Sequence, residues 1–377
     1  MNMKNVGIIA EYNPLHNGHL YQMNKINGNI IVALSGNFTE RGDVAMLNKY
    51  SRAKEAVMHG ASMVVEIPVF GVLSCAEHYA QCAVNTLDSL DIVDSICFGS
   101  ESGNIDTLKR IADMEENSDT KTIFDELLSN GMAYPKALTT ALASTSNIRG
   151  VEKILSQPNN ILGIEYIRAC KNTSIEPTTI ARVGSGYNDT TIEHGMFASA
   201  SSIRANLNDE SISEYLPRNV LESIRDSRVN IDALQSMLYE LLVVKEQNIE
   251  NILGISEGLD NRVRNVLESC PSYNELLASI KTKRYTMARI KRTLLAILIG
   301  IEKRHADLID NIDYVTVLAI KRNYLPMLGK CKAHVITKYN DYAKTNHPYA
   351  TLDKRADRLY NGIASDKITS HQMLIID

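Results

Sequence analysis

The sequence contains no uninterrupted apolar run that approaches the ~18–20 residues needed to cross a bilayer. It contains no internal repeat, no low-complexity tract and no pair of cysteines in a C-x-x-C arrangement. The first residues lead straight into an apolar stretch, so we expect no secretory signal peptide. These absences argue against a membrane protein, a disulfide framework and a C-x-x-C zinc site. They favour a cytoplasmic protein whose six scattered cysteines are reduced core residues.

The chain of 377 residues is long enough for two domains of roughly 100–200 residues each. Its net charge of −4 is unevenly distributed, because residues 281–344 contain fourteen Lys and Arg but only five Asp and Glu. This local excess of positive charge indicates that a polyanion binds the C-terminal part of the chain.

An apolar run, a turn and a helix start follow one another within residues 6–22. The run is short and rich in β-branched residues, so it predicts a strand, which an Asn-Pro turn ends. A helix that begins near Asn17 would present its free N–H groups and positive dipole end to the mouth of that strand, where they favour a phosphate. His16 and His19 could hydrogen-bond the same phosphate.

Strands and helices alternate up to about residue 205, which predicts an α/β domain with a doubly wound, Rossmann-like parallel sheet. Later strands are expected at residues 28–36, 61–68, 94–103 and, as the last of the sheet, 178–183. The polar segment 37–43 follows the second strand, so it should lie at the carboxyl edge, where ligands bind in open α/β folds. Beyond that part helical periodicities take over, so we expect one domain at 1–207 and a mostly α-helical, basic C-terminal domain at 208–377.

Two stretches outside this first segment carry further signals. Residues 198–204 place serines near a helix start and Arg204 one turn later, a pattern that either holds phosphates or caps an ordinary helix. Residues 280–292 place cations at near-helical spacing around one aromatic side chain. RNA backbone contact is favoured there over a solvated helix face, because the neighbouring sequence stays basic.

The segment His16-Asn17-Gly18-His19 resembles the HxGH signature of the nucleotidyltransferase superfamily. The resemblance implies that the two histidines stabilise the charge that develops as pyrophosphate leaves ATP. Residues 198–204 resemble the second signature of that superfamily, a helix start that faces the HxGH turn across the phosphates. Arg204 or a serine hydroxyl would then bind the β- and γ-phosphates and stabilise the leaving pyrophosphate.

Six stretches in order resemble one family more specifically, the bacterial tRNA(Met) cytidine acetate ligases. They are residues 7–19, 35–43, 98–101, 158–166, 198–204 and 280–286. The resemblance implies that acetate attacks the α-phosphate of ATP to give acetyl-adenylate and pyrophosphate. The wobble cytidine of elongator tRNA(Met) would then take the acetyl group and become N4-acetylcytidine. One departure is Glu40, where a glutamine is expected in this family.

The same resemblance implies the roles of individual residues. His16, His19 and Arg204 would be catalytic. ATP would be bound by Ile9, Ala10, Glu11, Tyr12, Asn13, Pro14, Leu15, His16, Asn17, Gly18, His19, Leu20, Tyr21, Gln22, Gly99, Asn159 and Arg182. Mg²⁺ is expected on the phosphates of ATP, and no metal ligands are assigned because no dedicated carboxylate cluster is found. Residues 1–207 would bind ATP and residues 208–377 would bind the tRNA.

Two alternatives stay open. One is an adenylyltransferase that acts on a small metabolite, although such a substrate does not need a large basic helical domain. The other is an RNA-binding protein with an inactive nucleotide site, against which the intact histidines and Arg204 argue. The sequence leaves the oligomeric state open.

Overall fold

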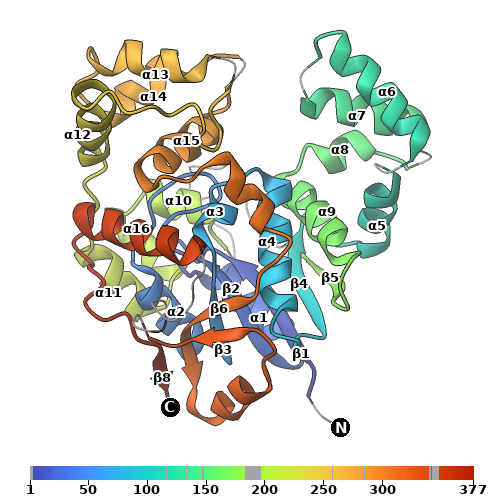
Figure 1. The fold of residues 1–377 in the computed structure, drawn as a ribbon. Helices are drawn as coiled ribbons and strands as arrows, with labels where there is room; N and C mark the ends of the chain where they lie inside the picture. Colours follow the sequence, from blue (N-terminus) through green and yellow to red (C-terminus); the bar gives the residue numbers. More distant parts are fainter. Residues whose placement is uncertain are drawn as a thin grey trace.

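The computed structural model describes residues 3–114, 117–132, 134–146, 148–182, 197–256, 258–283, 285–338, 341 and 348–377. Within these residues one eight-stranded sheet has the order β5-β4-β1-β2-β3-β6-β7, and β8 also pairs with β6 (Figure 1). The strands are β1 (Asn5–Ala10), β2 (Asn29–Ser35), β3 (Met63–Ile67), β4 (Ser95–Ser100), β5 (Glu176–Ala181), β6 (Tyr314–Lys321), β7 (His334–Ile336) and β8 (Leu374–Ile376).

The first five strands form the predicted parallel, Rossmann-like sheet, since β1 pairs in parallel with β2 and β4, β2 with β3, and β4 with β5. Strand β2 shows why this sheet is buried on both faces. Ile31 and Ala33 pack into one apolar cluster with α4 (Ala76–Asp88), whereas Val32 and Leu34 point into another with α2 (Lys49–Met58). The predicted fold class is confirmed.

The prediction that residues 178–183 form the last strand was wrong, because three later strands extend the same sheet. Strand β6 pairs antiparallel with β3, which makes the sheet mixed. All but the last residue of β6 are buried, so its apolar run does not alternate and cannot be told from a buried helix by periodicity. Strands β7 and β8 have three residues each, too few for a pattern. The division at residue 207 stays a prediction, but the chain beyond it completes the sheet.

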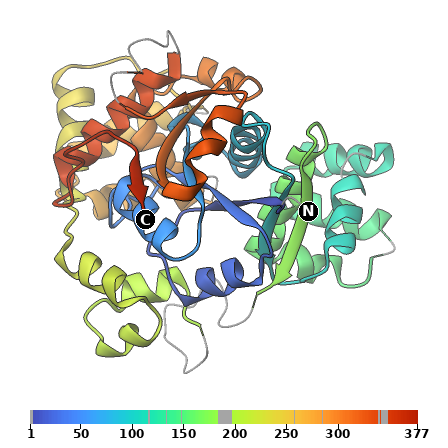
Figure 2. The same cartoon turned by 90° about the horizontal axis from the view of Figure 1, so that it is seen from below.

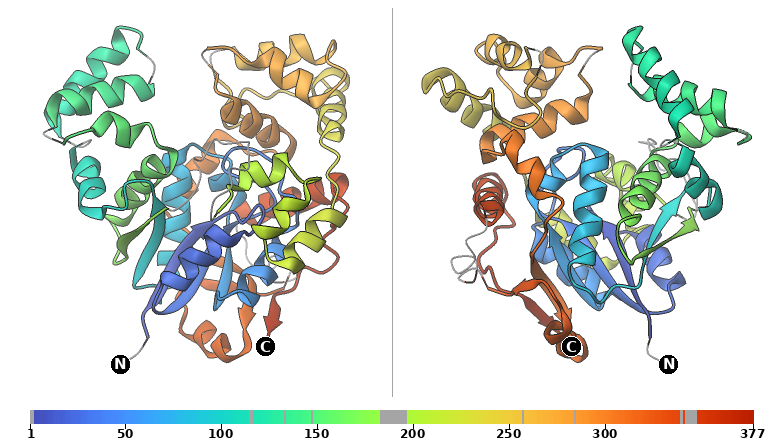
Figure 3. Two further views of the ribbon diagram at one scale, coloured as in Figure 1. Left: turned by 180° about the vertical axis from the view of Figure 1, so that it is seen from behind. Right: turned by 45° about the vertical axis from the view of Figure 1, so that its right-hand side comes forward.

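Helices flank the sheet and also form two separate groups beyond one end of it. The remaining helices that bear on the site are α1 (Asn17–Lys25), α5 (Ile105–Met114), α6 (Ser118–Ser129), α7 (Tyr134–Thr145), α8 (Val151–Leu155), α9 (Pro158–Cys170), α10 (Ala200–Ala205), α11 (Arg218–Asp226), α12 (Asp232–Tyr239), α13 (Leu259–Leu267), α14 (Tyr273–Ile280), α15 (Met287–Ile299) and α16 (Pro348–Ile363). Helices α6–α8 form one group and α12–α15 the other (Figures 1 and 3). Both chain ends lie at the opposite end of the sheet (Figure 2).

No helix in the described ranges combines the length and the apolar character that a bilayer crossing requires.

A buried cluster of charges joins α16 to the first half of the chain. The Lys49 ammonium, 1% exposed, lies 2.7 Å from a carboxylate oxygen of Glu66 and 2.9 Å from one of Asp357. Asp353 lies one helical turn before Asp357 and accepts hydrogen bonds from a backbone N–H and a tyrosine hydroxyl. Burial raises the pKa of Glu66 to about 8 and that of Asp353 to about 6. Two buried carboxyl groups, those of Glu66 and Asp357, therefore share the Lys49 ammonium, and Asp357 also lies 3.2 Å from His371.

Candidate active site

The turn between β1 and α1 is closed by the two histidines. Helix α1 begins at Asn17, as expected, and His16 is its N-cap. The Nδ1 atom of His16 accepts the N–H of Gly18 at 3.1 Å, and Nδ1 of His19 accepts the N–H of His16 at 3.3 Å. The two rings stack with their centroids 3.7 Å apart. Each imidazole is thus fixed by the backbone of the helix start that it caps.

This geometry sets the protonation of both rings. Burial, with the nearby charges of Arg182 and Arg204, lowers the pKa of His16 to about 3. Burial also lowers the pKa of His19 well below its usual value. Both rings are therefore neutral at pH 7. Because each Nδ1 accepts a hydrogen bond, the proton of each neutral ring is on Nε2, which is then a hydrogen-bond donor.

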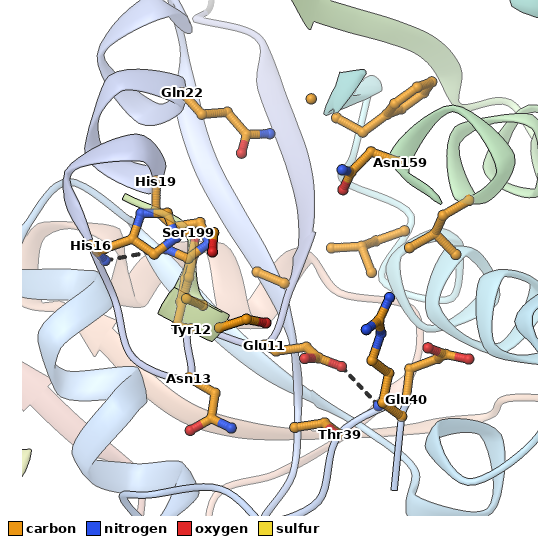
Figure 4. A pocket seen from close by; sticks show the side chains of 18 of the residues that line it. Glu11, Tyr12, Asn13, His16, His19, Gln22, Thr39, Glu40, Asn159 and Ser199 are labelled. Carbon is orange, nitrogen blue, oxygen red and sulfur yellow. Dashed lines mark hydrogen bonds between the residues drawn. The ribbon is translucent and has the colours of Figure 1, made fainter. Parts of the chain in front are cut away.

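A cavity opens beside the histidines at the carboxyl ends of β1 and β4 (Figure 4). Twelve of the predicted residues line it, namely Ile9, Ala10, Glu11, Tyr12, Asn13, His16, His19, Gln22, Gly99, Asn159, Arg182 and Arg204. A smaller adjoining hollow adds Gly18 and Tyr21. The structure therefore brings most of the predicted site together in one place.

Four predicted residues line neither hollow. They are Pro14, Leu15, Asn17 and Leu20. The side chain of Leu15 is 1% exposed and belongs to the apolar core, and the Asn17 amide donates to the carbonyl of Glu214 at 2.8 Å. The contact of these four residues with ATP stays a prediction. The side chains of Leu15 and Asn17 instead pack or hydrogen-bond against the protein.

Helix α10 faces the histidine turn across the cavity. Its N-cap Ser199 accepts the N–H of Ser202 at 3.0 Å, so residues 198–204 do contain a serine-capped helix start. Arg204 donates from Nη1 to the carbonyl of Asn13 at 2.7 Å and lines the cavity. Two segments about 190 residues apart in the sequence therefore meet around one hollow.

Several lining residues were missed from the sequence. They are Thr39, Glu40, Arg41, Asp43, Tyr79, Phe98, Leu162 and Tyr166, whereas Ser199, Ala200 and Ser201 also line the cavity and belong to the predicted helix start at 198–204. The first four belong to the polar segment expected at the carboxyl edge of the sheet, so their position carried the signal. Tyr79 and Tyr166 lie on α4 and α9 among core residues, and nothing in their local sequence distinguishes them from ordinary core positions.

The segment 37–43 is held between the cavity and α15. On the cavity side, the Glu11 carboxylate accepts the N–H of Glu40 at 2.7 Å (Figure 4). On the other side, Arg292 binds the Glu40 carboxylate at 2.8 Å and Lys291 binds that of Asp43 at 2.6 Å. Glu40, the departure from the expected glutamine, thus has a charged partner on α15.

The ion pairs correct part of the RNA prediction for residues 280–292. Lys291 and Arg292 are paired with the segment 37–43, so they are not simply a free cationic face. Tyr285 is 5% exposed, and the guanidinium carbon of Arg289 lies 5.2 Å from the centroid of the tyrosine ring. The ring of Tyr285 therefore packs within the protein and does not present a surface on which an RNA base could stack. Arg284 lies outside the described residues.

Glu11 stands out electrostatically among the acids of the cavity. Burial raises its pKa to about 7, against the lowering effect of the backbone hydrogen bond from Glu40. Arg41, Arg182 and Arg204 also line the cavity. The site therefore combines two neutral imidazole donors, three guanidinium groups and one carboxyl group that titrates near neutrality, a set suited to phosphates and to a proton transfer at pH 7.

A strand, an HxGH turn and a facing serine-capped helix around one cavity define a nucleotidyltransferase of the HxGH class. The family model of the HIGH nucleotidyl transferases matches residues 3–373. The chain is 35% identical to the tRNA(Met) cytidine acetate ligase of Acetivibrio thermocellus, over 92% of this chain and 91% of that protein. It is 38% identical to the tRNA(Met) cytidine acetate ligase of Caldicellulosiruptor saccharolyticus, over 93% and 91%.

Two solved structures show the same fold over the whole chain. Thermotoga maritima TmcAL in its apo form matches with a TM-score of 0.87 and 29% identity, and it covers 99% of this chain and 100% of that one. The same protein bound with alpha-thio ATP matches with a TM-score of 0.84 and 28% identity, at the same coverage. The chain belongs to the tRNA(Met) cytidine acetate ligase family. The predicted family and the predicted enzyme class, a ligase, are confirmed.

Proposed function

We propose that the chain ligates acetate to the wobble cytidine of elongator tRNA(Met) in two ATP-dependent steps. The observation that carries the proposal is the cavity between the histidine turn and α10, in a chain that aligns over more than nine-tenths of its length with ligases of that name. The relatives' name supplies the RNA, and the cavity supplies groups that fit the triphosphate of ATP.

In the first step a carboxylate oxygen of acetate attacks the α-phosphorus of ATP. A new P–O bond forms, the bond to the bridging oxygen between the α- and β-phosphates breaks, and pyrophosphate leaves. The Nε2–H groups of His16 and His19 donate to the phosphate oxygens that gain charge, and Arg204 neutralises the pyrophosphate. Positioning and charge stabilisation supply most of the rate, because phosphoryl transfer needs little covalent help from the protein.

In the second step the exocyclic amine of the cytidine attacks the carbonyl carbon of acetyl-adenylate. A C–N bond forms, the bond from the acetyl carbon to the phosphate oxygen breaks, and AMP leaves. The amine must lose one proton, and we assign the Glu11 carboxylate as its acceptor. A carboxyl group with a pKa of about 7 is matched to that task at neutral pH.

Mg²⁺ enters with ATP in this proposal, held by the phosphates. In the cavity Glu40 and Asp43 are paired with cations of α15, and Glu11 accepts a backbone N–H, so these carboxylates already have partners. We therefore assign no protein ligand to the ion. Its chemistry would be to neutralise the charge of the triphosphate.

A protein that modifies tRNA in this way would act in the cytoplasm. Residues 208–377 would supply the contacts to the phosphate backbone of the tRNA.

Transfer of radiolabelled acetate to bulk bacterial tRNA tests the function directly. We expect label in tRNA only when ATP is present, and we expect it in acetylcytidine after digestion. Pyrophosphate release with a small metabolite in place of acetate, and no label in tRNA, would favour the small-metabolite adenylyltransferase. Binding of tRNA without any turnover of ATP would favour the RNA-binding protein with an inactive site.

The ion pair between Glu40 and Arg292 gives a first prediction. Reversing one charge, as in Arg292→Glu, should displace the segment 37–43 and raise the KM for ATP about fivefold, because a half-buried pair is worth about 1 kcal/mol. The double variant Glu40→Arg with Arg292→Glu should recover most of that loss. Steady-state exchange of pyrophosphate into ATP measures both. Strictly additive effects in the double variant would show that the pair does not position the loop.

A further inference from the structure

A further hollow, separate from the small one that contains Gly18 and Tyr21, lies next to the ATP cavity and is not used by the steps above. Its volume is about 820 Å³, and it is formed by residues after β2, by α10 and the chain behind it, and by the end of α11 with the segment that follows. Arg204 lines both hollows, so they adjoin at its side chain. Sites of this size hold drug-sized ligands, which corresponds to about one or two nucleotides.

The lining of this hollow, here called the α11 groove, combines positive charge with apolar surface. Arg204, Arg225 and Arg228 supply three guanidinium groups, and Glu210 is the one acidic side chain among its lining residues. The apolar side chains are Val44, Met46, Leu207, Ile224, Val229 and Ile231. Arginine for phosphates beside an apolar surface for bases is the composition that single-stranded RNA requires.

Hydrogen bonds to residues outside the lining fix the walls of the α11 groove, so the groove has its shape without a ligand. The backbone N–H of Arg228 donates to the hydroxyl of Ser365 at 2.8 Å, and that of Asn230 donates to the carbonyl of Ile363 at 2.7 Å. The Ser227 hydroxyl donates to the carbonyl of Met46, which links two of the segments that line the groove. A preformed site loses less conformational entropy on binding.

Asn13 lines the ATP cavity and contacts two residues of the α11 groove, Met46 and Arg204. Its Oδ1 accepts the N–H of Met46 at 2.9 Å, and its own carbonyl accepts from Arg204. The Nδ2 group is buried and has no hydrogen-bond partner in the described part of the chain. Because the backbone N–H of Met46 fixes the orientation of the Asn13 amide, the Nδ2 group of Asn13 remains available to donate a hydrogen bond to a ligand.

We propose that the α11 groove binds the anticodon-loop nucleotides next to the target cytidine, so that this base reaches the acetyl-adenylate past Arg204. The inference rests on the proposed function, because it takes RNA as the substrate. This proposal places the RNA contact that is nearest to the ATP cavity in the α11 groove and not on α15, where Lys291 and Arg292 are paired with acidic residues. Phosphates of the loop lie on Arg225 and Arg228, and flanking bases pack on the apolar wall.

Two charge reversals on the same helix provide the test. Arg225 lines the groove near the end of α11. Arg218 is the first residue of the same helix and lies outside the groove lining. Among the contacts described, it pairs only with the exposed Glu222. We expect Arg225→Glu to raise the KM for tRNA in acetate transfer at least about tenfold and to lower the salt dependence of binding by about one phosphate contact. Arg218→Glu should change the KM for tRNA less than about twofold.

Direct binding of an anticodon stem-loop RNA of elongator tRNA(Met) separates the outcomes. Arg225→Glu should lose this binding and Arg218→Glu should keep it. Pyrophosphate exchange with acetate, which needs no tRNA, reports whether the ATP cavity of a variant is intact. If Arg225→Glu fails that check, Asn208→Glu replaces it, since Asn208 is exposed and lines the groove.

Equal stem-loop affinities and equal KM values for tRNA in Arg225→Glu and Arg218→Glu would overturn the assignment of the groove. A wild-type protein that transfers no acetate to tRNA would overturn the proposed function instead. In that case the stem-loop titration still decides whether the groove binds RNA.

Discussion

His19→Ala is expected to slow acetate-dependent pyrophosphate exchange by about two to three orders of magnitude, the usual effect of removing one preorganised donor from a transition state. The imidazole is neutral, since burial lowers its pKa far below 7, and it therefore acts as a hydrogen-bond donor from Nε2. The rate in the wild-type protein should accordingly show no loss between pH 6 and 7 that follows the titration of an ordinary histidine. Exchange kinetics over this pH range measure both effects.

The matched variant is His19→Gln, whose amide nitrogen takes nearly the position of Nε2. It should retain more activity than His19→Ala, because it keeps a donor although it changes the cap of α1. The affinity for tRNA should change little in either variant. Exchange within about tenfold of wild type in His19→Ala would contradict the assigned role, and a large loss of tRNA binding would contradict the division between an ATP cavity and an RNA surface.

Lys49→Met is expected to lower the free energy of unfolding by about 3–5 kcal/mol, because it removes the ammonium from the buried Glu66 and leaves Asp357 only His371. The control is Lys54→Met on the same helix, where the side chain is exposed and the expected change is within about 0.5 kcal/mol. Urea unfolding followed by circular dichroism measures both variants. A Lys49→Met protein as stable as Lys54→Met would show that the carboxyl groups are neutral without the ammonium.

The loss in Lys49→Met should depend on pH in a definite direction. Burial raises the pKa of Glu66 to about 8, so the folded state keeps a proton that the unfolded state releases above its ordinary pKa of 4.5. The contribution of this group to stability therefore falls as the pH rises from about 4.5 to about 8. Removing the ammonium raises the pKa of Glu66 further, so the part of the deficit that comes from Glu66 should be absent near pH 5 and should grow as the pH rises through about 8.

The features that the sequence predicted well depend on neighbouring residues. The first strand and the helix start at Asn17 follow from short patterns, and both are present. The histidine turn and the serine-capped helix at Ser199 were also found, since turns and caps have local residue preferences. That these two segments line one cavity with Arg182 and Gly99 follows from the parallel order of the strands.

The features that it missed depend on distant partners. Strand β6 has no alternation because both of its faces are covered, and only its pairing with β3 distinguishes it from a helix. Lys291 and Arg292 belong to a basic stretch, and nothing local shows that Asp43 and Glu40 lie opposite them. In the same way, the site tyrosines on α4 and α9 look like ordinary core residues until the sheet places them. The roles of the individual site residues stay predictions that the variants above test.

The return of the chain to its first sheet has a consequence for synthesis on the ribosome. Met63 of β3 pairs with Ile320 of β6, so an inner strand of the nascent chain has no neighbour on one side until more than 250 further residues have been made. At about 5–20 residues per second that interval is on the order of tens of seconds. During that interval one edge of β3 is unpaired, and Lys49 has its early partner Glu66 but not yet Asp357. Strong translational pausing between these segments should therefore increase aggregation of the newly made protein.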